Sequence, residues 1–138
     1  MTTIAEDIKT FVIASTAINS KIGTGTAARC HYNALPQSSI REHIWFRVSG
    51  DTVERTLDKV GGLHEAYVDL ECAAALESES QALADSVQGR LDGYAGAMGN
   101  STVQGCFLSD KDDSYEPRIK RTSGVHVATF DMHLWYTT

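Results

Sequence analysis

Residues 64–74 read HEAYVDLECAA and predict a long strand near the centre of a sheet. Side chains of a strand alternate between two faces, so this stretch divides its residues into two sets. The apolar set is Ala66, Val68, Leu70 and Cys72, and the mostly polar set is Glu65, Tyr67, Asp69 and Glu71. The pattern predicts that one face of the strand lies on a hydrophobic core and that the other does not.

Further stretches predict other strands of the same sheet. EHIWFRVSG (42–50) alternates in the same way, with Ile44, Phe46 and Val48 on one face and His43, Trp45 and Arg47 on the other. TVQGCFLSD (102–110) and GVHVATFDMHLWYT (124–137) predict two more strands, and AARCHY (27–32) predicts a short one. The chain therefore contains several predicted strands, which are expected to form one sheet.

Two helices are expected, over about 3–16 and 78–92. Thr3 and Glu6 have the spacing of a capping box, and the small and polar stretch NSKIGTGT (19–26) ends the first helix. Ser78 and Gln81 repeat that spacing, and Gly93 ends the second helix. We therefore expect an α+β domain, residues 1–138, with a largely antiparallel sheet and two helices packed on one face. The core should join two sets: Ile8, Val12, Leu83, Val87 and Leu91 from the helices, and Phe46, Val68, Leu70, Phe130, Met132 and Leu134 from the strands.

Two segments, 50–62 and 109–121, have few apolar residues and several charges. They predict loops that become ordered only on contact with a partner. The glycine pair Gly61-Gly62 supports this interpretation of the first segment, and the acidic stretch SDKDDSYEPR (109–118) supports it for the second.

The bulk composition limits the possible functions. The chain has 138 residues, 42% of them apolar, which suits one domain with one core. Twelve basic residues against eighteen acidic ones give a net charge of −6, which disfavours tight binding of nucleic acid. A small basic patch remains possible at Arg118, Lys120 and Arg121. The acidic start and the short apolar runs predict a soluble protein made in a cytoplasm, with no membrane contact.

Cysteine and histidine residues often form catalytic or metal sites, but their spacing in this chain does not support either kind of site. Cys30 and His31 are adjacent, so a strand would point them to opposite faces, and a core position is the preferred interpretation of Cys30. The three cysteines form no C-x-x-C pair, so we expect free thiols and neither a metal nor a cofactor. GTGTAA (23–28) matches a dinucleotide fingerprint in letters only, because it follows a predicted helix and precedes a strand.

Two other candidates remain weak. Asp131 and His133 share a face of the last strand and could orient a base, but no nucleophile motif accompanies them. The stretch 110–121 has acids at three positions of a calcium loop, yet Tyr115 replaces the required glycine and Arg121 the final glutamate. We therefore expect no enzyme.

The predicted non-core face of the sheet is unusual. Three aromatic residues, Trp45, Tyr67 and Trp135, lie on it among charges that include Glu65, Asp69, Glu71 and Asp131. Aromatic rings among charges favour a protein contact surface. Ordinary cross-strand packing that shields the rings explains the pattern equally well, and the sequence does not separate the two interpretations.

The order of these segments resembles the tail completion proteins of long-tailed phages, also called tail terminators or head–tail joining proteins. The resemblance extends over nearly the whole chain, from LPQ (35–37) through FRVSGD (46–51) and TLDKVGGLHEAYVDLECAA (56–74) to VATFDMHLWY (127–136). Its most specific parts are YVDLEC (67–72) and LDGYAG (91–96) followed by VQGCFLSD (103–110).

The resemblance implies a structural subunit of a hexameric ring, without catalysis or cofactor. The ring would cap the head-proximal end of the tail tube, contact the tube protein and a neck or stopper protein, and let genomic DNA pass without specific binding. Another neck ring, a tube protein and, less favoured, a small enzyme or ligand-binding domain using Asp131 and His133 remain alternatives. In such a ring Glu65, Asp69, Glu71 and Asp131 are expected to face the lumen, with Trp45, Tyr67 and Trp135 at contacts between subunits.

Overall fold

The computed structural model describes residues 3–25, 28–32, 42–55, 60–109, 111–116 and 125–137. Three helices and seven strands are present in these ranges. The helices are α1 (Ile4–Ile13), α2 (Thr16–Ile22) and α3 (Glu77–Leu91). The strands are β1 (Cys30–Tyr32), β2 (His43–Arg55), β3 (Val60–Ala74), β4 (Gly96–Met98), β5 (Ser101–Leu108), β6 (Asp112–Glu116) and β7 (Val125–Thr137).

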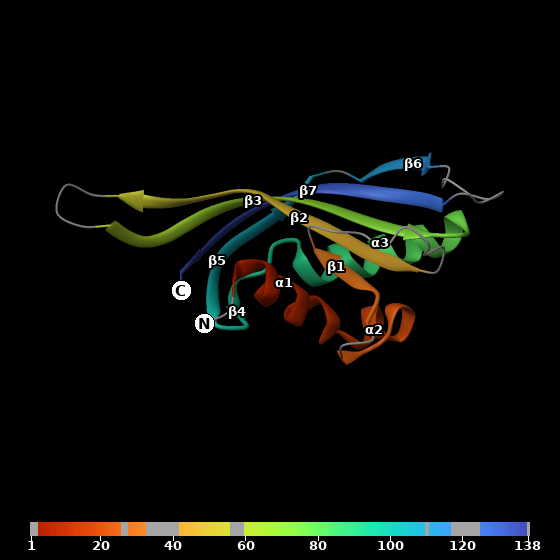
Figure 1. The fold of residues 1–138 in the computed structure, drawn as a ribbon, viewed down its shortest axis with the longest axis horizontal. Helices are drawn as coiled ribbons and strands as arrows, with labels where there is room; N and C mark the ends of the chain where they lie inside the picture. The colour runs from red at the N-terminus through yellow and green to blue at the C-terminus, as the bar shows by residue number, and fades with distance from the viewer. Residues whose placement is uncertain are drawn as a thin grey trace.

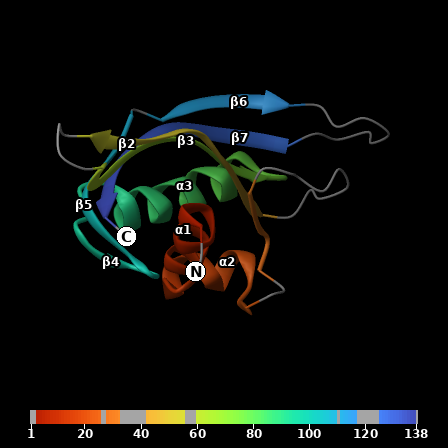
Figure 2. The same ribbon diagram turned by 60° about the vertical axis from the view of Figure 1, so that its left-hand side comes forward.

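All the described strands belong to one sheet, with β3 and β7 at its centre (Figure 1). Its order is β1-β2-β3-β7-β5-β4, and β6 pairs with the first half of β7. The ladder between β1 and β2 is parallel, and the other ladders of the described residues are antiparallel. The α+β class is therefore confirmed, but the sheet is mixed. Figure 2 shows that it curls, so that β5 and β4 bend around one side of the helices.

The helices cover one face of the sheet, which we call the inner face (Figures 1 and 2). The core residues expected from the sequence are buried there, since each has an exposed fraction of 2% or less. Burying a side chain such as Leu70 is worth about 2 kcal/mol. The alternation in β2, β3 and β7 therefore assigned the inner face correctly.

The first helical segment differs from the prediction of one helix over 3–16. Thr3 caps α1, because its hydroxyl oxygen accepts a bond from the Glu6 amide at 3.2 Å. The helix ends at Ile13, and the chain is extended at Ser15 before α2 begins. The predicted break at 19–26 thus contains a helix, because Ile18 and Ile22, spaced by one turn, are both buried in the core.

The third helix begins one residue earlier than the capping box predicted. Its N-cap is Leu76, with no side-chain cap bond, and Ser78 lies inside the helix. Ser80, on the buried side, donates a hydrogen bond to the Cys72 carbonyl at 3.1 Å instead, which ties α3 to the end of β3. Gly93 follows the helix with φ +76°, so the predicted C-terminal stop is confirmed.

The two predicted loops are largely strands where the structure describes them. β2 continues to Arg55 and β3 begins at Val60, so Gly61 and Gly62 lie inside a long hairpin. Residues 112–116 form β6, which pairs with β7 along five register positions. An edge strand rich in charged residues has the composition of a loop, so the sequence alone does not distinguish the two. Such a segment becomes a strand when a partner strand satisfies its backbone hydrogen bonds. Residues 56–59, 110 and 117–121 lie outside the described residues.

Two polar contacts hold the helix layer together. Arg90 of α3 donates two hydrogen bonds to the Phe11 carbonyl of α1, at 3.2 and 3.0 Å, and its guanidinium lies 3.8 Å from the centre of the Phe11 ring. The buried Asp7 accepts hydrogen bonds from the Ser101 hydroxyl at 2.7 Å and the Asn100 amide at 3.2 Å. Asp7 thereby fixes the β4–β5 turn to α1.

A search of the described helices found none with the length and apolar character of a membrane span.

Candidate functional site

The face of the sheet opposite the helices, which we call the open face, carries most of the side chains that the sequence marked as candidates. The β3–β7 register places Tyr67 opposite His133, Glu65 opposite Trp135 and Asp69 opposite Asp131. The β2–β3 register adds Trp45 opposite Glu71 and Arg47 opposite Asp69. All seven predicted residues are on this face, but they divide into two groups along the strands.

The first group consists of aromatic rings that contact one another across neighbouring strands. Tyr67 stacks on His133 with ring centres 4.4 Å apart, and His133 lies 3.8 Å from Trp135. Phe107, on β5, meets Trp135 edge-on at 5.8 Å. We call Leu63, Tyr67, Phe107, His133 and Trp135 the aromatic patch. Tyr67 is 49% exposed and Phe107 is 55% exposed, so the patch offers rings to a partner.

A hollow of about 500 Å³ opens beside Trp135 and Phe107. Leu63, Gly105 and Thr137 contribute to its wall. A Cβ at Gly105 would lie 3.3 Å from the Phe107 ring and 3.8 Å from the Trp135 ring, so the missing side chain leaves room between the two rings. The hollow has the size and apolar lining to accept an aliphatic side chain.

Glu65 joins this aromatic group and not the other carboxylates. One of its oxygens, Oε1, accepts a hydrogen bond from the Tyr67 hydroxyl at 2.8 Å and lies 2.7 Å from His133 Nε2. The Tyr67 bond, and after it the His133 contact, lower the pKa of Glu65. The same bond to Glu65 raises the pKa of Tyr67. The candidate pair of His133 with Asp131, already considered weak from the sequence, is therefore not the contact observed, because His133 contacts Glu65 on the neighbouring strand.

The second group is acidic. Asp69 and Asp131 face each other across β3 and β7, and Glu71 follows on β3. Arg47 pairs with Asp69 at 3.0 Å, with both side chains largely in solvent. We call Asp69, Glu71 and Asp131 the acidic strip. Two carboxylates directly opposite each other repel, so this strip is better suited to repelling anions or binding cations than to stabilising the fold.

Trp45 belongs to neither group. It lies beside Glu71, two register steps beyond Asp69, and its ring is half-buried. Its indole Nε1 has no hydrogen-bond partner among the residues that the structure describes. The structure thus brings Tyr67 and Trp135 together through His133 and leaves Trp45 apart from them.

Phe107 and Leu63 were missed by the sequence analysis. Counting outward from the buried Val103 by strict alternation would put Phe107 in the core. A register shift between Val103 and Gly105 inserts one residue, so Cys106 turns inward and Phe107 turns outward. The glycine within TVQGCFL was the available signal, since an isolated glycine in a strand often marks such a bulge.

The cysteines and their histidine neighbours form no reactive site in the described residues. Cys30 is buried in the core, as expected, and burial raises the pKa of its thiol to about 12. Burial also raises the pKa of Cys106 to about 12 and raises that of Cys72. His31 is half-buried, and burial, then the charge of Lys9, lower its pKa. Among the described residues no group of three or more His, Cys, Asp or Glu side chains could hold a metal ion.

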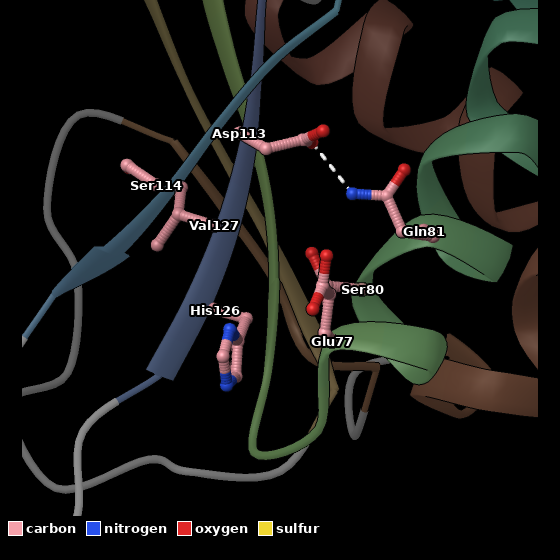
Figure 3. Close-up of a pocket in the computed structure, with 7 residues that line it drawn as sticks. All are labelled: Glu77, Ser80, Gln81, Asp113, Ser114, His126 and Val127. Atoms are coloured by element: carbon pink, nitrogen blue, oxygen red, sulfur yellow. Dashed lines mark hydrogen bonds between the residues drawn. The ribbon is translucent and has the colours of Figure 1, made fainter.

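A smaller pocket of about 160 Å³ lies where the start of α3 meets β6 and β7. Figure 3 shows Gln81 reaching from α3 toward Asp113 on β6, and the two side chains are joined by a 2.6 Å hydrogen bond. Lys111 contacts Gln81 and lies 3.5 Å from Asp85. These contacts attach β6 to the helix layer, so the pocket is explained by the packing of the edge strand.

Comparisons with known proteins give a structural likeness only. No family model matches the chain, and no curated protein matches it. A chain in a solved structure described as the virion of a native gene transfer agent particle is similar in fold, with a TM-score of 0.60 and 13% sequence identity. The match covers 98% of this chain and 95% of that one, so the two chains are similar in fold over nearly their whole lengths.

Proposed function

We propose that this chain is a structural subunit of a phage-like virion and that it forms a ring at the junction of tail and head. In this proposal the ring is hexameric, caps the head-proximal end of the tail tube and joins it to a neck or stopper protein. The subunit catalyses no reaction, uses no cofactor and is assembled into the particle in the host cytoplasm.

One observation carries this proposal: the likeness to a chain of a gene transfer agent virion extends over nearly all of both chains. The order of sequence segments, which resembles tail completion proteins, supports the same assignment independently of that likeness. The open face adds a physical reason, because a sheet with one face covered by helices has a second face available for assembly (Figure 1).

The acidic strip and the aromatic patch have properties that suit two different surroundings in a ring around DNA: the lumen and the contact with a neighbouring subunit. The acidic strip repels phosphate, so a lumen lined by it would let the genome slide, whereas a basic lining would bind DNA by releasing counterions. The aromatic patch suits a contact between subunits, where exposed rings contribute most. In the proposed orientation the acidic strip of Asp69, Glu71 and Asp131 faces the lumen, and Tyr67 and Trp135 face a neighbouring subunit. Glu65, which was expected in the lumen, goes with the rings because it is bonded to Tyr67 and His133.

Removing the gene from a strain that makes the particle tests the assignment. Loss of a tail terminator should leave tails of uncontrolled length that do not join heads, as seen by electron microscopy. Tails of normal length beside DNA-filled heads that leak would instead indicate another neck ring. Absence of tails would indicate a tube protein, and normal particles would contradict the proposal altogether.

The lumen orientation has its own test. Replacing the acidic strip, Asp69, Glu71 and Asp131, together by lysine should leave the fold intact, because all three side chains lie on the open face. DNA passage should be impaired, measured as gene delivery per assembled particle. Replacing the same three residues by glutamine provides the control, since it removes negative charge without adding a phosphate-binding lining. A neck structure with these side chains on the outer wall would contradict the orientation.

A further inference from the structure

Strand β6 differs from the other long strands because none of its side chains at 112–115 is buried. All four are exposed, and Tyr115, whose ring centre lies 5.0 Å from that of His126, is 56% exposed. Every other strand of more than three residues contributes buried apolar side chains. Figure 2 shows β6 at the outer border of the sheet, beside β7. Burial of apolar surface therefore contributes little to holding β6 in place.

Besides the ladder with β7, polar contacts with α3 hold β6. The Gln81 side chain of α3 donates a hydrogen bond to Asp113 at 2.6 Å and accepts one from Lys111. Lys111 also lies 3.5 Å from Asp85 of α3. We call Gln81, Asp85, Lys111 and Asp113 the clip. Figure 3 shows Gln81 and Asp113 reaching toward each other beside the pocket of about 160 Å³ between β6 and α3. Exposed hydrogen bonds and ion pairs contribute little net free energy, so the clip does not fix β6 firmly.

The chain just before β6 is anchored to β7. The Ser109 amide donates to the Asp131 carbonyl at 2.9 Å, and the Asp131 amide donates to the Ser109 hydroxyl at 2.8 Å. These two bonds continue the β5–β7 ladder beyond its register pair of Leu108 with Met132. An opening of β6 would therefore stop at Ser109 and leave β5 in place.

Strand β6 covers one edge of the first half of β7. On that side β5 and Ser109 pair with β7 only from Asp131 onward, so within the described residues β6 is the one partner of 125–129. An opening of β6 would leave backbone N–H and C=O groups of 125–129 unpaired. An unpaired strand edge is a template for pairing with another chain, and covering the edge is one way in which proteins prevent such pairing.

We infer that β6 is a strap that opens as one unit at Ser109 and that, when closed, shields residues 125–129 of β7 from strand pairing with a second copy. The clip determines how often the strap opens. A copy with an open strap offers this edge to its neighbour, and backbone hydrogen bonds then join the two sheets. The contacts that carry the inference all lie within one chain, so it is independent of the proposed ring.

Residue-resolved hydrogen exchange of the purified chain tests the opening. Amides that bond across the β6–β7 ladder should exchange at least about a hundredfold faster than those that bond across the β5–β7 ladder, because the strap opens without global unfolding. Gln81→Ala should speed exchange across the β6–β7 ladder by a further factor of about five. Ser86→Ala, which removes another exposed hydrogen bond of α3, is the control and should change neither ladder. Equal protection of the two ladders, or no response to Gln81→Ala, would overturn the inference.

A disulfide that locks the strap gives a reversible test. Ser114 and Val127 are register partners, and such partners have Cα separations that a disulfide can span. The oxidised double variant Ser114→Cys, Val127→Cys should exchange as slowly across the β6–β7 ladder as across the β5–β7 ladder, and reduction should restore fast exchange. The three native cysteines are buried, so they do not compete for the new pair. Fast exchange that persists after mass spectrometry has verified the disulfide would show that the strap does not open in the way inferred.

Self-association, measured by sedimentation, tests the shielding. The double variant Gln81→Ala, Lys111→Ala should associate about tenfold or more tightly than the wild type, because the apparent affinity rises with the fraction of open copies. The oxidised lock should associate more weakly than the same variant after reduction, and Ser86→Ala should match the wild type. If the opened, wild-type and locked chains all associate equally, or none of them associates, the strap does not shield this edge and the inference fails.

Discussion

The inner and open faces of the sheet are made by alternate residues of the same strands, yet they differ in almost every physical property. On β3 the inner positions Val68 and Leu70 are buried beneath helices, while the open positions Tyr67 and Asp69 remain partly in solvent. The inner face holds the fold together by excluding water. The open face carries partly exposed rings and charges, from which we expect only small contributions to stability, and this is why we place the function there.

The largest loss of stability is expected when a side chain of the inner face is truncated. Leu70→Ala should lower the free energy of unfolding by about 2–5 kcal/mol, because the helices cannot close the cavity fully. Urea unfolding measures it, and Phe130→Ala should behave in the same way. Tyr67→Ala, at the neighbouring open position, is the control and should cost about 1 kcal/mol or less. Equal losses at positions 67 and 70 would contradict the division into two faces.

A buried carboxylate provides the next largest effect. Asp7→Ala removes the acceptor for the Ser101 hydroxyl and the Asn100 amide, and should cost about 2 kcal/mol in thermal or urea unfolding. Glu6→Ala, one residue earlier on α1, is the matched control and should cost little. If Asp7→Ala were no worse than Glu6→Ala, the β4–β5 turn would not depend on this clamp.

A glycine in the same turn gives an independent test of that clamp. Gly99 has φ +57°, and a Cβ there would lie 2.3 Å from Asp7 Oδ1. Gly99→Ala should therefore destabilise the chain by about 1–3 kcal/mol through backbone strain and displacement of the carboxylate. Asp7→Ala removes the two closest atoms, Oδ1 and Cγ, and leaves only the Cβ at 3.1 Å, so adding Gly99→Ala to that variant should cost less than it does alone. Additive losses would show that the two residues act separately.

A smaller effect is expected from the ion pair on the open face. Arg47 and Asp69 are only 3.0 Å apart, but their side chains are 57% and 40% exposed, so water screens them. Arg47→Ala should change the free energy of unfolding by about 1 kcal/mol or less, and added salt should reduce the change further. A loss as large as that of Leu70→Ala would show that the open face also carries the fold.

The smallest effect should appear only as a pH dependence. The pKa of Glu65 is lower in the folded chain than in the unfolded one, so its stabilisation is present above the ordinary glutamate value of about 4.3 and is lost as the pH falls through the folded pKa. Tyr67 behaves oppositely, because its raised pKa makes its contribution fade as the pH rises beyond about 10. Stability curves of wild type and Glu65→Gln should therefore converge in acid. If the two curves stayed parallel at every pH, the contacts of Glu65 would not be the source of the pH dependence.

The sequence by itself determined the α+β class, the two faces of β2, β3 and β7, and the core residues that these strands, α1 and α3 were expected to supply. These features follow from alternation and helical spacing, which are local properties of the chain. It also identified the polar and aromatic residues proposed for the open face, except Phe107, and it missed the aliphatic Leu63. Local patterns are enough to assign the faces of a strand wherever its side chains alternate without a bulge.

Only the tertiary structure decided what depends on pairing between distant segments. The bulge before Gly105 turns Phe107 outward, and the β3–β7 register gives His133 to Glu65 and not to Asp131. Residues 112–116 become a strand because β7 supplies their hydrogen bonds, and α2 forms because the core receives Ile18 and Ile22. Register, bulges and edge pairing are set by contacts far apart in the sequence, so no local pattern contains them.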